Sequence, residues 1–132
     1  MLNEPLWLPV EQAIRANQDE VAATAEAHAI LDMAKLESAM SRPQNHCVYD
    51  GEHDVLRLAV ILALAIAQAH AFEQGNKRTG WVCGLLFLAL NGYEMTWDDE
   101  SVAEEFIKLI EGKISIDRFE EQIVYFIREI PR

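Results

Sequence analysis

The sequence is poor in basic residues and in cysteine, and each scarcity excludes a class of protein. It has 11 Lys and Arg against 22 Asp and Glu, a formal net charge of −11. Because proteins that grip nucleic-acid backbones rely on clustered Lys and Arg, we expect no nucleic-acid surface. The two cysteines, Cys47 and Cys83, form no CxxC pair, and no signal-peptide pattern opens the chain. These features predict a cytoplasmic protein.

Long apolar runs are also scarce. The longest unbroken run, Leu58 to Ala67, lies between Arg57 and Gln68. It is much shorter than the roughly 20 residues of a membrane span. We therefore expect a buried helix there and no membrane association. Internal repeats, low-complexity linkers and domain boundaries are absent as well, so residues 1–132 are predicted to form a single domain.

Caps, breakers and apolar spacing predict an all-α bundle of about six helices. The first helix has Pro9 in its first turn and runs towards Val21, and the alanine-rich stretch 22–29 extends it or forms a separate turn. Asp32 caps a second helix, which Pro43 is expected to stop.

The centre of the bundle is predicted to be two strongly apolar helices, 54–70 and 77–90. Asp54 and Asn76 are their expected N-caps, and two amphipathic helices follow, 101–110 and 117–130. Before the first central helix, Val48 and Tyr49 are the only strand-like pair of their segment, so we expect a short loop or small hairpin there.

The stretch HAFEQGNKRTG, residues 70–80, joins the two central helices and carries most of the candidate chemistry. At the start of the second helix, the backbone N–H groups of Lys77, Arg78 and Thr79 should lack intrahelical acceptors and should face the positive end of the helix dipole. Gly75 allows close approach of a ligand, and the two cations add full positive charges. The stretch therefore predicts a phosphate pocket.

His70 ends the preceding helix only a few residues earlier, which should bring its ring beside this pocket. An imidazole can act as a general base, taking a proton from an attacking hydroxyl while cations and N–H groups stabilise the phosphoryl group. Phe72 would turn inward and anchor the loop. Taken singly, His70 and Phe72 could equally be structural residues, and Lys77 and Arg78 solvated charges; their combination at this spacing favours a site.

The stretch also resembles the Fic/Doc signature, and Lys77 between Asn76 and Arg78 is similar to the Doc (death-on-curing) toxin branch, whose motif reads H-x-F-x-D/N/E-x-N-K-R-T. Three other segments are similar to Doc-like proteins: LESAMSRPQN, LLFLALNGYEMT and IEGKIS. The resemblance covers about residues 31 to 125. It implies a Fic-fold bundle in which the motif loop joins the central helices.

The resemblance implies a role for each residue of the motif. His70 would deprotonate the target hydroxyl, and Phe72 would be the buried aromatic. The nucleotide phosphates would lie against Gly75, Asn76, Lys77, Arg78 and Thr79.

Two positions separate the branches of the family. Fic enzymes that transfer AMP carry Gly where Lys77 stands and a second Arg where this chain has Trp81. Both differences favour the Doc branch, which implies transfer of the γ-phosphoryl group of ATP to a threonine of elongation factor Tu, so that translation stops. AMP transfer stays open as an alternative.

Gln74 departs from the family pattern, which has an acidic Mg²⁺ ligand at this position. An amide can coordinate Mg²⁺ through its oxygen but brings no charge, so metal affinity should fall. Glu73 is acidic, but a shift of one residue in a tight loop should point it elsewhere. A weakened enzyme, an altered transfer and a catalytically silent binding module are three open interpretations. A zinc site of the cysteines with His46, His53 and His70 lacks ligand spacing.

The resemblance also implies two surfaces. Residues 45–54 would form a flap on which Val48 and Tyr49 pair with the target backbone, although a plain connecting loop is an alternative. A cognate antitoxin would dock in an apolar groove of the first helices. Trp7 is a candidate for that groove or for closing the core.

Overall fold

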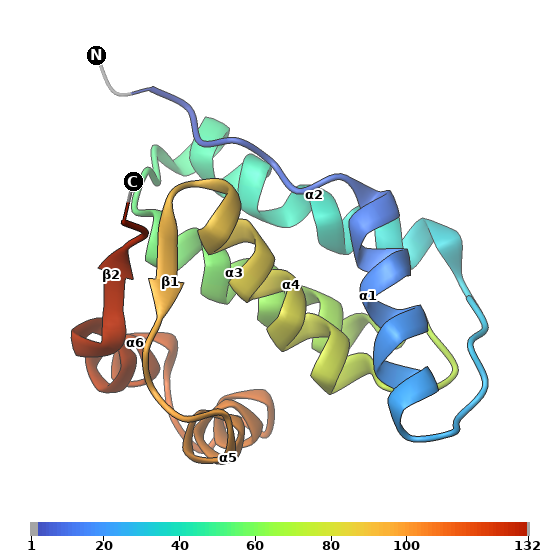
Figure 1. The fold of residues 1–132 in the computed structure, drawn as a ribbon. Coiled ribbons are helices and arrows are strands. Elements are labelled where there is room, and N and C mark those ends of the chain that lie inside the picture. The colour runs from blue at the N-terminus through green and yellow to red at the C-terminus, as the bar shows by residue number, and fades with distance from the viewer. Residues whose placement is uncertain (1–2, 132) are drawn as a thin grey trace.

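The computed structural model describes residues 3–131, apart from the side chain of Asp99, and it confirms a mostly helical bundle (Figure 1). The helices in chain order are α1 (Val10–Ala23), α2 (Met33–Asp50), α3 (Val55–Ala69), α4 (Asn76–Leu90), α5 (Asp99–Ile110) and α6 (Ile116–Ile123). A 3₁₀ turn over Val124–Phe126 and an antiparallel ribbon of β1 (Tyr93–Met95) and β2 (Ile127–Glu129) complete the fold. None of the helices in this part of the chain is long and apolar enough to cross a membrane.

The central helices α3 and α4 approach each other closely because α4 presents glycines where α3 presents alanines. A Cβ added at Gly80 would lie 2.5 Å from the carbonyl oxygen of Ala63, and one added at Gly84 would lie 3.1 Å from the Cβ of Ala63. The backbones therefore meet with no side chain between them on the α4 side. This contact sets the separation of the two helix ends that carry the HAFEQGNKRTG loop.

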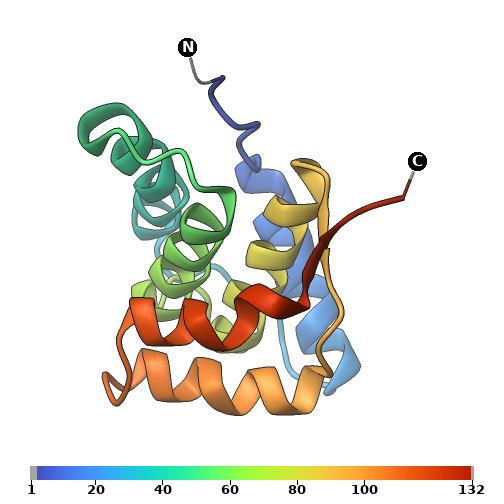
Figure 2. The same ribbon diagram turned by 90° about the vertical axis from the view of Figure 1, so that its left-hand side faces the viewer.

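Helix α3 lies between two apolar clusters. The first involves α1, α2 and α4, and its largest fully buried members are Leu36, Leu58, Leu62, Ile66, Phe72 and Phe87. The second involves α5 and α6, and it contains Val60, Val102, Phe106, Phe119 and Ile123. Figure 2 shows α5 and α6 lying side by side along one end of the molecule, away from α2. The HAFEQGNKRTG loop packs against the first cluster through Ala71 and Phe72.

The expectation that Pro43 stops the second helix is wrong. Helix α2 continues through Pro43 to Asp50. Proline removes one backbone donor and disfavours a helix interior, but the buried residues Leu36, Ala39, Pro43 and Cys47 recur at helical spacing. Their shared burial against α3 outweighs the local cost of the proline. Only residues 51–54 remain between α2 and α3, and Val48 and Tyr49 are helical.

The last helix is also shorter than expected. Helix α6 ends at Ile123 instead of reaching Ile130, because Val124–Phe126 form a 3₁₀ turn and Ile127–Glu129 pair with β1. Residues Tyr93 to Met95 match Glu129 to Ile127 in antiparallel register, and the N–H of Thr96 donates to the carbonyl of Phe126 at 2.7 Å. The β-branched and aromatic residues at 124–127 disfavour continuation of the α-helix.

Two of the expected N-caps are confirmed. The carboxylate of Asp32 accepts from the N–H of Lys35 at 3.0 Å, and that of Asp54 accepts from the N–H of Leu56 at 3.0 Å. These short side chains satisfy donors that the first helical turn leaves free.

Candidate active site

The turn between α3 and α4 is a strained connection of six residues, 70–75. His70 ends α3 in the left-handed region, with φ 52° and ψ 39°, and Gly75 precedes α4 at φ 74° and ψ 20°. A non-glycine residue in this region costs about 1–2 kcal/mol. The surrounding contacts must therefore hold the backbone of His70, whose side chain is exposed.

Asn76 braces this turn and does not cap α4. Its amide nitrogen donates to the carbonyl of Phe72 at 2.8 Å, and its oxygen accepts from the N–H of Phe72 at 3.1 Å. The predicted cap is therefore wrong: Gly75 occupies the N-cap position, without a side-chain bond. Both hydrogen-bonding ends of the Asn76 amide are used inside the loop, and the ring of Phe72 is buried.

Backbone hydrogen bonds from the segment before α2 hold the turn in place. The carbonyl of Ala71 accepts from the N–H of Leu31 at 2.7 Å and from that of Asp32 at 3.2 Å. The N–H of Glu73 donates to the carbonyl of Ala29 at 2.9 Å. Three backbone hydrogen bonds thus tie residues 71–73 to a part of the chain about 40 positions away.

Asn17 of α1 joins the turn to α4 from beneath, and its side chain is fully buried. Its amide nitrogen donates to the carbonyl of Gln74 at 2.8 Å and to the hydroxyl of Thr79 at 3.0 Å. Its oxygen lies 2.7 Å from Nδ1 of His28, which donates to it. A buried amide with all these partners stabilises one loop geometry, because losing any partner would strand a polar group.

One pocket of about 310 Å³ gathers the polar groups of the turn. It is lined by Glu26, Ala67, His70, Glu73, Gln74, Gly75, Asn76, Lys77 and Arg78. Among the hydrogen bonds of the described residues, the backbone N–H groups at positions 76, 77 and 78 have no acceptor. These donors, the helix dipole and two cations suit an anion, and His70 opens into the same space.

Thr79 does not face this pocket. Its N–H donates to the carbonyl of Gly75 at 2.9 Å, and its buried hydroxyl is bonded to Asn17. The expectation of a free N–H group at Thr79 is therefore wrong, since Gly75 as N-cap already supplies its acceptor. The unpaired donors begin one residue earlier, at Asn76.

Arg78 is already engaged by a carboxylate. Its Nη2 lies 2.5 Å from Oε1 of Glu26, and its Nη1 donates to the hydroxyl of Thr24 at 3.1 Å. The hydrogen bonds from Thr24 and then from Arg78 hold the pKa of Glu26 below its usual range. Glu26 is thus an anion that already lies in the lining of this pocket.

This geometry agrees with the comparison against known proteins. The model of the Fic/DOC family matches residues 7–88, well over half of the chain. The chain belongs to the Fic/Doc family.

Curated relatives carry Doc names. The chain is 29% identical over 85 residues to the "Protein kinase doc" of Escherichia phage P1, a match covering 64% of this chain and 67% of that protein. It is 35% identical over 81 residues to the "Toxin Doc" of Mycolicibacterium smegmatis, a match covering 59% of this chain and 62% of that protein. The family match contains the whole turn between α3 and α4, whereas α5 and α6 lie outside it.

The residues that could hold a metal in this Fic/Doc site are few. Gln74, at the position where the resemblance implies an acidic ligand, is a neutral residue of the pocket lining, and Glu73 belongs to the lining as well. Within residues 3–131, no group of three or more His, Cys, Asp and Glu side chains could hold a metal ion. This finding also applies to the suggested zinc site of cysteines and histidines.

The expected flap of this Fic/Doc chain takes a different form. Val48 and Tyr49 lie in the last turns of α2 with exposed side chains, 58% and 81% accessible. A helical backbone satisfies its own N–H and C=O groups and offers no edge for strand pairing. The predicted loop or hairpin is reduced to residues 51–54.

Two tryptophans have structural positions. Trp7 stacks on Phe87 with ring centroids 5.9 Å apart and packs against the first cluster, so it covers the core. Trp81, at the position of the second arginine of AMP-transferring relatives, packs against Phe106 and Phe119 in the second cluster. Its ring therefore contributes to the scaffold and lies outside the pocket lining.

Asn17 and Glu26 were missed by sequence reasoning. Asn17 has a detectable signal, because it falls in line with Ala13 and Val21 on the buried face of α1, where a polar side chain needs a partner. Glu26 has none, since it stands in an alanine-rich connection whose path depends on tertiary contacts.

Proposed function

We propose that this Fic/Doc chain is a Doc-like toxin that transfers the γ-phosphoryl group of ATP to a hydroxyl of a target protein, with elongation factor Tu as the candidate target and arrest of translation as the result. The observation that carries the proposal is that an exposed imidazole, His70, lines the same pocket as Lys77, Arg78 and the unpaired N–H groups of α4. The Doc names of the relatives support the same activity.

In the proposed reaction, a ring nitrogen of His70 accepts the proton of the target hydroxyl. The freed oxygen attacks the γ-phosphorus, and the bond from that phosphorus to the β,γ-bridging oxygen breaks. ADP leaves with the electron pair, and the phosphorylated target is released. A positioned base of this kind contributes about 10²–10⁴-fold to a rate.

The start of α4 handles the phosphate charge in this proposal. The N–H groups of Asn76, Lys77 and Arg78 donate to phosphate oxygens, and Lys77 adds a full charge beside them. Gly75 supplies the positive φ from which α4 begins, and a Cβ there would crowd Val21, Arg78 and Asn17. Arg78 can join only when its guanidinium exchanges Glu26 for the phosphate.

Metal assistance fits the side chains of the pocket poorly. Mg²⁺ is normally held by one or two carboxylates together with phosphates, and the ligand position carries the neutral Gln74. We propose that Mg²⁺ binds weakly, and no step above passes through it.

A second candidate follows from Gln74. A pocket that keeps its N–H groups and cations but lacks the acidic ligand can bind a nucleotide without transferring any part of it. In this case the chain is a catalytically silent binding module of the Fic fold.

One labelling experiment separates the candidates. The protein is incubated with elongation factor Tu and ATP labelled in turn at the γ and α phosphates, with His70→Ala as control. Label from the γ position supports phosphoryl transfer, label from the α position supports AMP transfer, and binding of ATP with no transfer supports the silent module. Unchanged transfer by His70→Ala would refute the base.

The role of Gln74 has its own test. Gln74→Glu restores an acidic ligand, so it should raise both Mg²⁺ affinity and transfer if metal binding is the defect. Gln74→Ala is the matched control, since it changes the same position without adding a charge. An equal response of both variants would refute the metal explanation.

We also propose a cognate antitoxin as the partner that keeps the toxin inactive. Exposed apolar side chains lie beside the first helices, with Leu6 60% and Leu31 65% accessible. The backbone of Leu31 is hydrogen-bonded to the turn between α3 and α4. A partner helix could cover such side chains. Co-expression with the product of an adjacent small gene should abolish growth arrest, and a Leu31→Glu toxin should escape that protection.

A further inference from the structure

His70 lines a second pocket besides the one that contains Arg78. This pocket, of about 310 Å³, lies between α2 and α3, and its lining includes Lys35, Ser38, Arg42, Gln68 and His70. Its floor is formed by alanines of α2 and α3. The lining contains two cations and no carboxylate. The imidazole therefore stands between a phosphate-type pocket and a separate cationic one.

The cationic pocket continues into a longer groove. Arg42, Ala65 and Gln68 also line a neighbouring pocket of about 380 Å³, which extends along α2 to Asp50. From Lys35 to Asp50, α2 rises roughly 22 Å at 1.5 Å per residue. An extended peptide of about seven residues spans that length at roughly 3.3 Å per residue. The two pockets together have the dimensions of a peptide groove, the α2–α3 groove.

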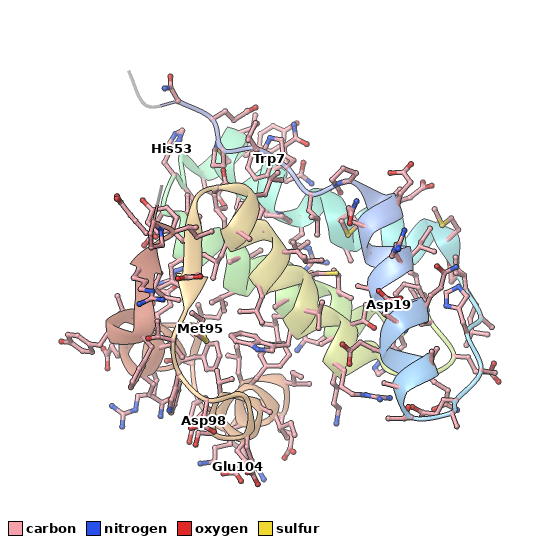
Figure 3. All side chains as sticks on the ribbon, viewed as in Figure 1. Trp7, Asp19, His53, Met95, Asp98 and Glu104 are labelled. Atoms are coloured by element: carbon pink, nitrogen blue, oxygen red, sulfur yellow. The ribbon has the colours of Figure 1, made fainter. Side chains whose placement is uncertain are left out.

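The charges of this groove contrast with the rest of the molecule. The chain carries a net charge of −11, and two acidic residues, Asp98 at the N-cap of α5 and Glu104 within α5, lie on the far side of the molecule from α2 (Figure 3). Among the ion pairs of the described residues, neither Lys35 nor Arg42 has a partner. The positive field of the groove is thus unneutralised at the end next to His70.

The far end of the groove is acidic. His46 lies 2.9 Å from the carboxylate of Asp50, and Arg57, 3.9 Å from that of Glu52, is shared with Glu120 and Asp117. The groove therefore has a direction, with positive charge that has no ion-pair partner near the candidate base and carboxylates away from it.

We infer that the α2–α3 groove binds the acceptor protein as an extended segment whose acidic side chain, within about three residues of the acceptor hydroxyl, meets Lys35 and Arg42. The inference rests on the proposed function, since it takes His70 as the base. The nucleotide belongs in the other pocket, where the unpaired N–H groups lie. Complementary charge would select the hydroxyl that reaches the imidazole.

The test compares short threonine peptides that carry Asp, Gln or Lys beside the threonine. Their binding to the wild-type protein is measured by fluorescence anisotropy, which needs no catalysis, and ATP binding is measured separately. We expect the acidic peptides to bind best. The double variant Lys35→Glu/Arg42→Glu should lose about tenfold in affinity for them and should prefer the basic peptides.

Arg15→Glu is the matched control, because Arg15 is exposed on α1 and lines neither pocket. It should leave the peptide preference unchanged. Equal binding of the three peptides to the wild-type protein overturns the inference without any variant. So does a loss of ATP affinity in the double variant with peptide binding intact, since the groove would then hold nucleotide.

Failure of the proposed function gives a different result. In that case, no label passes from ATP to any peptide, while the acidic preference in the anisotropy measurement persists. The site for the acceptor and the chemistry at His70 are therefore judged by separate measurements.

Discussion

Arg78 and Arg57 are both held by glutamates, but the two sites differ in their surroundings. Arg78 meets Glu26 at 2.5 Å in a pocket that also contains unpaired N–H groups. Arg57 meets Glu120 at 2.6 Å where α3 packs against α6, and it also bonds to Asp117. The first arginine faces space for another anion, whereas the second is surrounded by carboxylates.

The pKa values of the two glutamates record this difference. Hydrogen bonds from Thr24 and Arg78 lower the pKa of Glu26. Burial raises the pKa of Glu120 to about 7 and outweighs the attraction of Arg57, whose charge is shared with neighbouring carboxylates. The same pair of residue types is thus a contact that a ligand can replace in one place and a connection between helices in the other.

The largest effect should follow from Arg78→Ala. Removing a cation that stabilises the transferred phosphoryl group should lower the rate of transfer about 10²–10³-fold, with little change in the free energy of unfolding. Steady-state transfer from labelled ATP measures the rate. Arg57→Ala is the control for ATP affinity, since Arg57 lies outside the pocket at the start of α4, and similar losses of ATP affinity in both variants would erase the distinction between the two arginines.

Arg57→Ala should instead lower the free energy of unfolding. Loss of the guanidinium leaves the half-buried Glu120 without its counter-charge, at a cost of about 2 kcal/mol at a pH above its pKa of about 7, where this carboxyl is ionised. Denaturant unfolding followed by circular dichroism measures this change. ATP affinity should stay as in the wild-type protein, because Arg57 lies outside the pocket at the start of α4.

Glu26→Gln should sharpen the comparison from the ligand side. The neutral amide competes less well with phosphate for Arg78, so ATP affinity should rise about fivefold. Isothermal titration calorimetry gives the affinity, with Glu20→Gln as a control that changes a nearby charge without touching the guanidinium through its side chain. Weaker ATP binding by Glu26→Gln would show that Glu26 positions Arg78 for the ligand.

The smallest effect concerns Glu120→Gln. The folded-state pKa of Glu120 lies above its ordinary value of 4.5, so its contribution to stability is present below pH 4.5 and is lost as the pH rises through about 7. The variant should flatten this dependence by about 0.5–1 kcal/mol, since the side chain is partly solvated. Unfolding free energies at pH 5 and pH 8 provide the check. An unchanged difference between these pH values would contradict the assignment.

Local signals predicted the central part of the fold. The apolar runs of α3 and α4 and the caps Asp32 and Asp54 depend on neighbouring residues alone, and the structure contains them. Pro43 and the end of α6 were predicted wrongly because tertiary contacts decide them. One is the buried stripe of α2, and the other is the pairing of β2 with β1.

The candidate site shows the same division. The presence of His70, Lys77 and Arg78 around one turn could be predicted from their spacing, and the structure places all three on one pocket. The hydrogen bonds of Asn76 to Phe72 and the contact of Arg78 with Glu26 could not be predicted in this way. Their partners lie inside the loop and in a connection distant in the sequence. Sequence patterns thus identified the reactive groups more readily than the groups that hold them.

The contact of Gly80 with Ala63 has a consequence for how such a site can change. The distance between the imidazole at the end of α3 and the cations at the start of α4 depends on the close backbone contact of the two helices at Gly80 and Ala63, one turn into α4. A methyl group added at Gly80 would force α3 and α4 apart and widen the pocket between their ends. The distance between the proposed base and the phosphate pocket can therefore be changed by a substitution at Gly80, which does not line the pocket.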